Sequence, residues 1–292
     1  MFRGTFTALV TPFQNGNIDL AALEKLIEAQ IVAGISGLVA VGTTGESPTL
    51  AHDEREEVIR TAVEIAHGRC AVLAGTGSYS TSDAVESTRR AEKLDADGVL
   101  LVAPYYNKPS QEGLFRHFKA VAEKTSRPIM LYNIPGRCSV DIGADTVVRL
   151  AESCRNIVAI KEASGSVERV SELRRRLPDE FTILSGDDSL TLPFMAVGAV
   201  GVVSVASNLL PSEVCALVRS FGSGDVKAAE SLHRRLFPLF KDLFIEPNPV
   251  PVKTALAWRG AMSAEVRLPL CEMSEANQTR LRKTLGGFEK AK

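Results

Sequence analysis

Short runs of hydrophobic residues recur along the first two-thirds of the chain, and stretches with polar positions separate them. The runs are continuous rather than alternating, which is typical of parallel strands that are covered on both faces. They predict eight strands, at positions 6–10, 38–41, 71–74, 99–103, 129–132, 157–160, 181–184 and 200–205.

The stretches between these runs carry hydrophobic residues at helical spacing. In the first of them Asp19 is a candidate N-cap, and Leu20, Leu23, Ile27 and Ile31 follow on one face. The same pattern predicts helices at 19–32, 52–65, 80–94, 110–124, 144–154, 166–177 and 190–197.

Strands that alternate with helices predict an α/β protein, and eight of them favour a (β/α)8 TIM barrel over positions 1–210. A doubly wound open sheet is the alternative. Thr11-Pro12-Phe13 follows the first strand, where that fold carries a glycine-rich turn. Positions 211–292 show helical patterns and no strong strand. They predict a C-terminal helical extension packed on the barrel, with an ordered turn at 247–251.

Composition narrows the function classes. The 34 basic and 35 acidic residues give a formal net charge of −1, so a nucleic-acid partner has no electrostatic support. The five cysteines are widely spaced and form no CxxC pair, which favours free thiols in a reducing compartment. No signal peptide and no apolar stretch of membrane-spanning length are recognised, so we expect a cytoplasmic protein without a membrane partner.

The active site of such a barrel lies at the carboxyl ends of its strands. Lys161 ends the sixth hydrophobic run, and burial there lowers the pKa of an amine so that it can attack a carbonyl. Position alone favours a solvated lysine paired with Glu162. Only the polar residues that follow the other strands favour a nucleophile.

Several of those polar residues carry hydroxyl groups. Tyr132, Thr43 and Tyr106 can form a chain that passes protons. Thr43 and Thr44 lie in a glycine-framed loop that suits a carboxylate, and Arg137 can clamp a second carboxylate. Each has a simpler interpretation: a strand-end aromatic for Tyr132, helix caps for the threonines and a surface cation for Arg137.

Metal and cofactor signals are weak. The four histidines, His52, His67, His117 and His233, are scattered and form no zinc motif. We interpret Asp187 and Asp188 as turn or helix caps rather than metal ligands. We therefore expect neither a metal nor a cofactor.

Six motifs together resemble the dihydrodipicolinate synthase family, which belongs to a superfamily of pyruvate-dependent lyases. The resemblance covers the chain from Thr5 to about Pro269. The motifs are GTTGES at 42–47, PYYNKP at 104–109, YNIPGR at 132–137, the IKEAS run around Lys161, SGDD at 185–188 and NPVPVK at 248–253.

The resemblance implies an imine between Lys161 and pyruvate, and an enamine that attacks L-aspartate 4-semialdehyde, a step towards diaminopimelate and lysine. It implies no cofactor beyond that covalent imine. The matching relay residues are Tyr132, Thr43 and Tyr106, the last reaching into a neighbouring subunit. The matching substrate-binding residues are Thr44, Val203, Arg137 and Gly186.

The resemblance also implies a homotetramer, arranged as a dimer of dimers, and a site for feedback by lysine. The residues that match the feedback site are Ser47, His52, Tyr79, Asp83 and Tyr105. Tyr79 stands where inhibited members often have asparagine. We therefore predict weak or absent inhibition by lysine.

Other functions stay open from the sequence. One is another pyruvate-dependent enzyme of the superfamily, such as N-acetylneuraminate lyase or a 2-keto-3-deoxy sugar acid aldolase. Arg137 favours the semialdehyde, because a short carboxylate substrate needs a cation where a polyol needs hydroxyl partners. A metal-dependent aldolase and a non-catalytic binding barrel are further alternatives.

Overall fold

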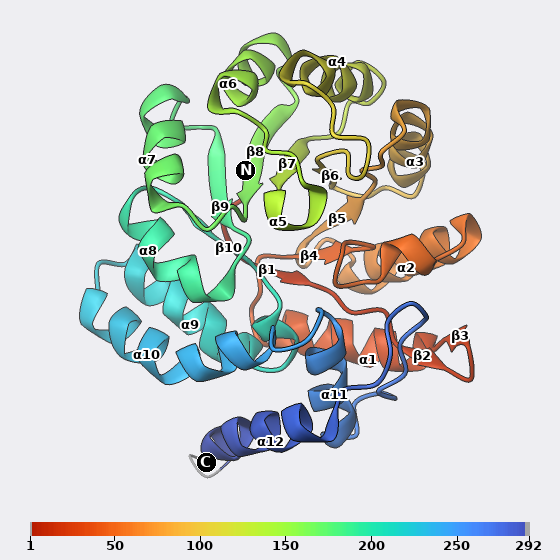
Figure 1. Ribbon diagram of the computed structural model, residues 1–292, viewed down its shortest axis with the longest axis vertical. Coiled ribbons are helices and arrows are strands. Elements are labelled where there is room, and N and C mark those ends of the chain that lie inside the picture. The colour runs from red at the N-terminus through yellow and green to blue at the C-terminus, as the bar shows by residue number, and fades with distance from the viewer. Residues whose placement is uncertain (1, 290–292) are drawn as a thin grey trace.

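The computed structural model describes residues 2–289, and its central feature is a closed barrel of eight parallel strands (Figure 1). The strands follow one another around the barrel in chain order, and β10 closes it against β1. The prediction of a (β/α)8 barrel is confirmed, and the open sheet is excluded. The barrel strands are β1 (Gly4–Ala8), β4 (Gly37–Ala40), β5 (Ala71–Gly75), β6 (Gly98–Val102), β7 (Ile129–Asn133), β8 (Ile157–Glu162), β9 (Thr182–Ser185) and β10 (Gly201–Ser204).

Helices form a ring outside the strands (Figure 1). Several begin where the sequence provides a polar cap: Asp19, Ser80, Ser110 and Ser166 each accept a hydrogen bond from a backbone N–H of the first turn. The ring consists of α1 (Leu20–Val32), α2 (His52–Ala66), α3 (Thr81–Lys93), α4 (Gln111–Ala122), α6 (Ala144–Ser153), α7 (Val167–Arg176), α8 (Thr191–Ala196) and α9 (Pro211–Gly222).

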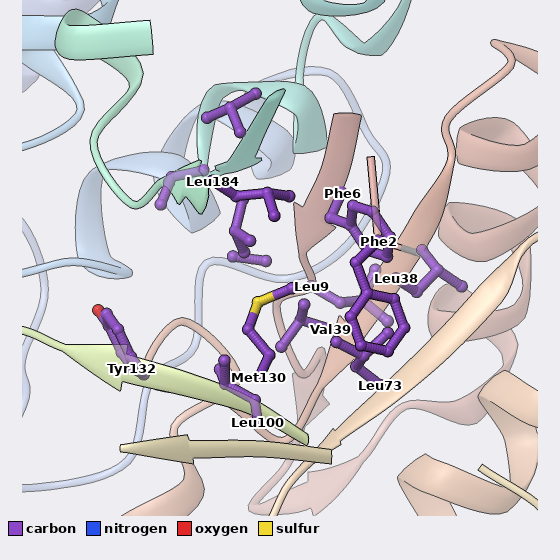
Figure 2. Close-up of a cluster of buried hydrophobic side chains, with 14 of the residues drawn as sticks. Phe2, Phe6, Leu9, Leu38, Val39, Leu73, Leu100, Met130, Tyr132 and Leu184 are labelled. Carbon is purple, nitrogen blue, oxygen red and sulfur yellow. The ribbon is translucent and has the colours of Figure 1, made fainter. Parts of the chain in front are cut away.

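Aromatic side chains fill the amino-terminal end of the barrel. The rings of Phe2 and Phe6 meet edge to face with centroids 5.9 Å apart. Gly98 begins β6 beside them, and a β-carbon there would lie 2.7 Å from Phe2. Figure 2 shows Met130 within this hydrophobic cluster and Tyr132, further along β7, apart from it. Hydrophobic side chains therefore fill the amino-terminal end of the barrel, and the polar residues of the candidate site lie at its carboxyl end.

The structure corrects some details of the prediction. The first strand spans Gly4–Ala8 rather than 6–10. A hairpin of β2 (Phe13–Gln14) and β3 (Asn17–Ile18) was not predicted. Its Asn15-Gly16 turn has positive φ at both residues, which is the backbone that an Asn-Gly pair favours. Three 3-10 turns, η1 (Ser47–Thr49), η2 (Asp188–Leu190) and η3 (Ala206–Asn208), and the short α5 (Pro135–Cys138) were also not predicted.

The last part of the described chain is helical, as predicted. It contains α10 (Val226–Asp242), α11 (Val250–Trp258) and α12 (Glu275–Glu289). α9 packs against β1 and β10, α10 packs against α9, and α12 packs against α10 and α11. The turn predicted at 247–251 leads directly into α11, where Pro251 lies in the first turn. The division of the chain at 210 and 211 stays a prediction.

Within residues 2–289 no helix combines the length and the hydropathy that a membrane crossing requires.

Candidate active site

Lys161 and Tyr132 are neighbours at the carboxyl end of the barrel. They face each other across the paired strands β8 and β7. Lys161 Nζ lies 4.1 Å from the centroid of the Tyr132 ring, and the two residues are only 6% and 4% exposed. The structure thus brings together the two groups that the sequence singled out first.

Glu162, the next residue, points to the other side of the strand, because successive side chains alternate. Its Oε2 accepts a hydrogen bond of 2.7 Å from Arg169 Nε, and Asn133 Nδ2 donates to both of its carboxylate oxygens. The ion pair of Glu162 is therefore with Arg169. The simpler interpretation, a solvated Lys161 paired with Glu162, is wrong.

Burial lowers the pKa of Lys161 to about 7. Desolvation is the largest cause, because the charged amine loses its water shell; the Asp188 carboxylate opposes it and the Arg137 cation adds to it. A large part of the amine is therefore neutral near pH 7, as a nucleophile requires.

Burial shifts the pKa of the Tyr132 hydroxyl in the opposite direction from that of Lys161. Burial raises its pKa above the usual value, while Arg137 and a hydrogen bond with the Thr43 side chain act in the lowering direction. Tyr132 therefore stays a neutral phenol, which can both donate and accept a hydrogen bond. Two neighbouring hydroxyls of this kind are able to pass a proton between them.

The loop that carries Thr43 is held in an unusual backbone conformation. Val41 and Glu46, on either side of Gly42–Gly45, both have positive φ, 56° and 55°. For a β-branched residue such as Val41 this is a strained conformation of the kind that gathers at functional sites. A small cavity beside this loop is lined by Thr43, Ser47 and Tyr132. A larger groove lies elsewhere, between α1 and α11, and contains none of these three residues.

Gly186 lies against Lys161. A β-carbon at position 186 would stand 3.1 Å from Cγ and Cε of Lys161 and 2.8 Å from the Ala163 β-carbon. Val202 pairs with Ser185, so Val203 and Gly186 follow at the same level, on the inner face of the barrel. Gly186 is therefore in contact range of the Lys161 side chain, and Val203 faces the same barrel interior from the next strand.

The other predicted site residues lie around this centre. Thr44 is 3% exposed, and its Oγ1 accepts a hydrogen bond of 2.9 Å from Asn248 Nδ2. Arg137 is exposed on α5, and its charge acts on both Lys161 and Tyr132. Tyr106 is 92% exposed, with φ of 74°, so its hydroxyl is not enclosed by the site of its own chain.

The comparisons with known proteins agree with one another. A model of the dihydrodipicolinate synthetase family matches residues 1–287. The chain belongs to this family. It is 51% identical over 288 residues to 4-hydroxy-tetrahydrodipicolinate synthase of Endomicrobium trichonymphae, which covers 99% of each chain. The predicted family and the prediction of an enzyme, a lyase, are confirmed.

Two further proteins show the same likeness over nearly their whole length. The enzyme of that name from Sorangium cellulosum is 54% identical over 288 residues, which are 98% of this chain and 96% of that relative. The solved 4-hydroxy-tetrahydrodipicolinate synthase of Methylacidiphilum fumariolicum SolV is 59% identical. Its TM-score is 0.98, and the match covers 99% of this chain and 97% of that one. The predicted activity is the one that these relatives' names carry.

The residues that match the feedback site of the dihydrodipicolinate synthetase family gather only in part. The rings of Tyr79 and Tyr105 meet edge to face with centroids 5.4 Å apart, and the charge of Asp83 acts on Tyr105. Ser47 shares the small cavity with Thr43, and its carbonyl accepts a hydrogen bond from Arg55. The fifth residue, His52, begins α2 and is exposed.

One buried carboxylate was underestimated by the sequence analysis. Asp187 caps η2 as expected, but Asp188 is 2% exposed and accepts hydrogen bonds from Ser204 Oγ and from the backbone of Val205 and Ala206. Burial raises the pKa of Asp188 to about 6. Asp188 is thus hydrogen-bonded to the end of β10, and its carboxylate also acts on the pKa of Lys161. Its position after a buried strand was the available signal.

A buried ion pair was missed altogether. Lys253 Nζ lies 2.6 Å from Glu46 Oε1, and both side chains are essentially inaccessible to solvent. Both residues stand inside motifs of the family, but 207 positions separate them. Their spacing along the chain gave no basis for predicting the contact.

Metal ligation finds no support in the geometry of the described chain: residues 2–289 contain no group of three or more His, Cys, Asp or Glu side chains placed to hold an ion.

Proposed function

We propose that the chain condenses pyruvate with L-aspartate 4-semialdehyde to give 4-hydroxy-tetrahydrodipicolinate, and that Lys161 is the nucleophile. The observation that carries the proposal is the burial of the Lys161 amine beside Tyr132, with a pKa lowered to about 7. An aldolase of this kind needs a neutral amine enclosed by groups that move protons.

The covalent steps balance without an oxidant or a reductant. Lys161 Nζ attacks the ketone carbon of pyruvate, and the adduct loses water to give an imine. Loss of a proton from the methyl group gives an enamine, whose methylene carbon then forms a bond to the aldehyde carbon of the semialdehyde. The amino group of the semialdehyde moiety then adds to the imine carbon, and the bond between this carbon and Lys161 Nζ breaks. This transfer closes the ring, releases the product and regenerates the amine. The imine nitrogen accepts the electrons that a metal ion would otherwise stabilise.

Tyr132, Thr43 and Tyr106 are the proposed proton relay. The position of Thr43 supports its first link, because Thr43 acts on the pKa of the Tyr132 hydroxyl and lines the same small cavity. The exposure of Tyr106 supports a role in a neighbouring subunit, because a hydroxyl that is 92% exposed in one chain is free to enter another.

Thr44, Val203, Gly186 and Arg137 are the proposed substrate-binding residues. Thr44 offers a hydroxyl to the carboxylate of pyruvate, while Val203 and Gly186 leave room beside Lys161. Arg137 lies at the mouth of the site, where its cation meets the carboxylate of the semialdehyde.

We propose a cytoplasmic homotetramer, a dimer of dimers in which the tight dimer completes each site. We also propose that lysine inhibits this enzyme weakly or not at all. The proposal rests on the bulk of Tyr79, whose ring packs on Tyr105 where asparagine would leave more room for a free lysine.

The decisive experiment is reductive trapping. The chain is incubated with pyruvate, reduced with borohydride and mapped by mass spectrometry. We expect the adduct on Lys161 and none on Lys253, the buried lysine whose charge Glu46 holds. An untreated sample of the same protein should turn over L-aspartate 4-semialdehyde, and not sugar acids, in the presence of a chelator. An unmodified Lys161 at saturating pyruvate would overturn the proposal.

A further inference from the structure

The motif NPVPVK at 248–253 plays no part in the proposed chemistry, yet it touches the loop that does. Asn248 lies two residues before the start of α11, and Lys253 lies within that helix, in the C-terminal part of the chain. Asn248 contacts Thr44, and Lys253 contacts Glu46. Two residues of one distant segment thus hold both ends of the short stretch 44–46.

We infer that Asn248 is a positioning residue, which orients the Thr44 hydroxyl as a hydrogen-bond donor to the carboxylate of the 2-oxo acid. This inference rests on the proposed function, since it assigns to Thr44 the carboxylate of pyruvate.

The direction of one hydrogen bond carries the argument. Asn248 Nδ2 donates to Thr44 Oγ1 over 2.9 Å, in a buried environment. A hydroxyl has one hydrogen to donate and two lone pairs that accept. Because Asn248 occupies a lone pair, the hydrogen of Thr44 is left to donate, and a carboxylate only accepts. The Asn248 amide therefore orients the Thr44 hydroxyl so that its hydrogen can be donated to an anion.

Asn248 is not placed to satisfy its own polar groups. It is 6% exposed, and within residues 2–289 its Oδ1 has no hydrogen-bond partner. A buried acceptor without a partner costs about 1–3 kcal/mol of stability. A residue that served only the fold would be better replaced by an apolar one, so this cost indicates a role at the site.

The loop needs such an external restraint, because its own backbone is strained. Val41 and Glu46 adopt left-handed conformations that their side chains disfavour, and surrounding structure must hold them there. Glu46 is held from the C-terminal part of the chain: Lys253 Nζ donates to Oε1, and the backbone N–H of Arg267 donates to Oε2 over 3.0 Å. Lys253 also donates to the carbonyl of Thr11 over 2.9 Å.

The test uses Asn248→Leu, which keeps the size of the side chain and removes its donor. Imine trapping is measured against pyruvate concentration, together with turnover and melting temperature. We expect the pyruvate concentration at half-saturation to rise about tenfold. This is the change in affinity expected when one buried hydrogen bond to a charged ligand is lost. Trapping at saturating pyruvate should still reach Lys161, and the melting temperature should not fall.

Asn248→Asp is the second variant. Its carboxylate accepts the hydrogen of Thr44 and repels the anion, so we expect pyruvate to bind at least as weakly as in Asn248→Leu. The matched control is Asn156→Ala. Like Asn248, Asn156 donates through Nδ2, in its case to the carbonyls of Ala122 and Thr125. It lies before β8, at the opposite end of the barrel. The Asn156→Ala variant should therefore trap pyruvate with the same concentration dependence as the unaltered chain.

A double-mutant cycle separates positioning from a general structural effect. If Asn248 acts through Thr44, Asn248→Leu should have no further effect on half-saturation in a Thr44→Val background. Additive effects, or a folded Asn248→Leu protein with an unchanged pyruvate dependence, would overturn this inference alone. Failure of the unaltered chain to trap pyruvate on Lys161 would overturn the proposed function, and this inference with it.

Discussion

Gly186 leaves the space that the side chain of Lys161 occupies: a β-carbon at position 186 would stand 3.1 Å from both Cγ and Cε of the lysine. Contacts of this length require the neighbour to move. Since the Ala163 β-carbon would be closer still, at 2.8 Å, the strain has no easy release. The position of the amine therefore depends on the absence of a side chain on the adjacent strand end.

We predict that Gly186→Ala slows imine trapping by at least about tenfold, because a small displacement of a reacting group has a large effect on rate. Gly136→Ala is the control, since a β-carbon at Gly136, on α5 near the site, would meet nothing within 4 Å. Equal trapping rates in the two variants would show that the amine tolerates displacement.

The pH dependence follows from the Lys161 pKa of about 7. Below this pH the amine is protonated and cannot attack, while above it the neutral amine predominates. The initial rate of trapping at low pyruvate should therefore rise through pH 7 and level off above pH 8. A rate that continued to rise towards pH 10 would indicate an ordinary, solvated lysine.

Asp188→Asn refines the same prediction. The carboxylate of Asp188 acts on Lys161 in the direction that raises its pKa. Its neutral replacement should therefore move the inflection of the trapping profile to lower pH. A shift to higher pH would contradict the electrostatic role of Asp188.

Stability depends on the buried pair of Glu46 and Lys253. Lys253→Met leaves Glu46 as an uncompensated buried charge, which should cost about 3–5 kcal/mol of the free energy of unfolding. Glu46→Gln combined with Lys253→Met should be much less harmful, because neither charge remains. Urea unfolding measures both variants.

Arg234→Gln is the control for this prediction. Arg234 and Glu230 form an exposed pair at 3.7 Å, and pairs of this kind contribute little. A Lys253→Met variant as stable as Arg234→Gln would mean that the buried pair is not needed.

Tyr106 provides a test of the subunit arrangement. Lys161→Ala and Tyr106→Phe proteins should each have little activity alone. After unfolding and refolding together, mixed dimers hold one site with both intact residues, so about one quarter of the full activity should return. A mixture no more active than its components would place Tyr106 outside the neighbour's relay.

Inhibition by lysine tests the interpretation of Tyr79. Its ring is half exposed and packs on Tyr105, so we expect millimolar lysine to leave turnover nearly unchanged. Tyr79→Asn, which removes the ring, should increase the sensitivity. Activity halved by sub-millimolar lysine in the unaltered chain would contradict the prediction.

Much of this protein was readable from the order of its residues. Continuous hydrophobic runs predicted all eight barrel strands. Lys161 was found because it directly follows such a run, and Tyr132 because it is the last residue of one. Strand ends of a barrel meet at one rim, so sequence alone placed these two side chains near each other. The hairpin at Asn15-Gly16 was not predicted, although an Asn-Gly pair favours this turn.

Only the tertiary structure decided what surrounds the amine. Hydrophobic periodicity reports which face of a strand or helix is buried, but it carries no information about which distant segment covers it. The contacts of Asn248 with Thr44 and of Lys253 with Glu46 join residues 204 and 207 positions apart. They exist because the barrel closes and the C-terminal helices pack beside its first strands, and a pKa depends on that enclosure rather than on the residues adjacent in the chain.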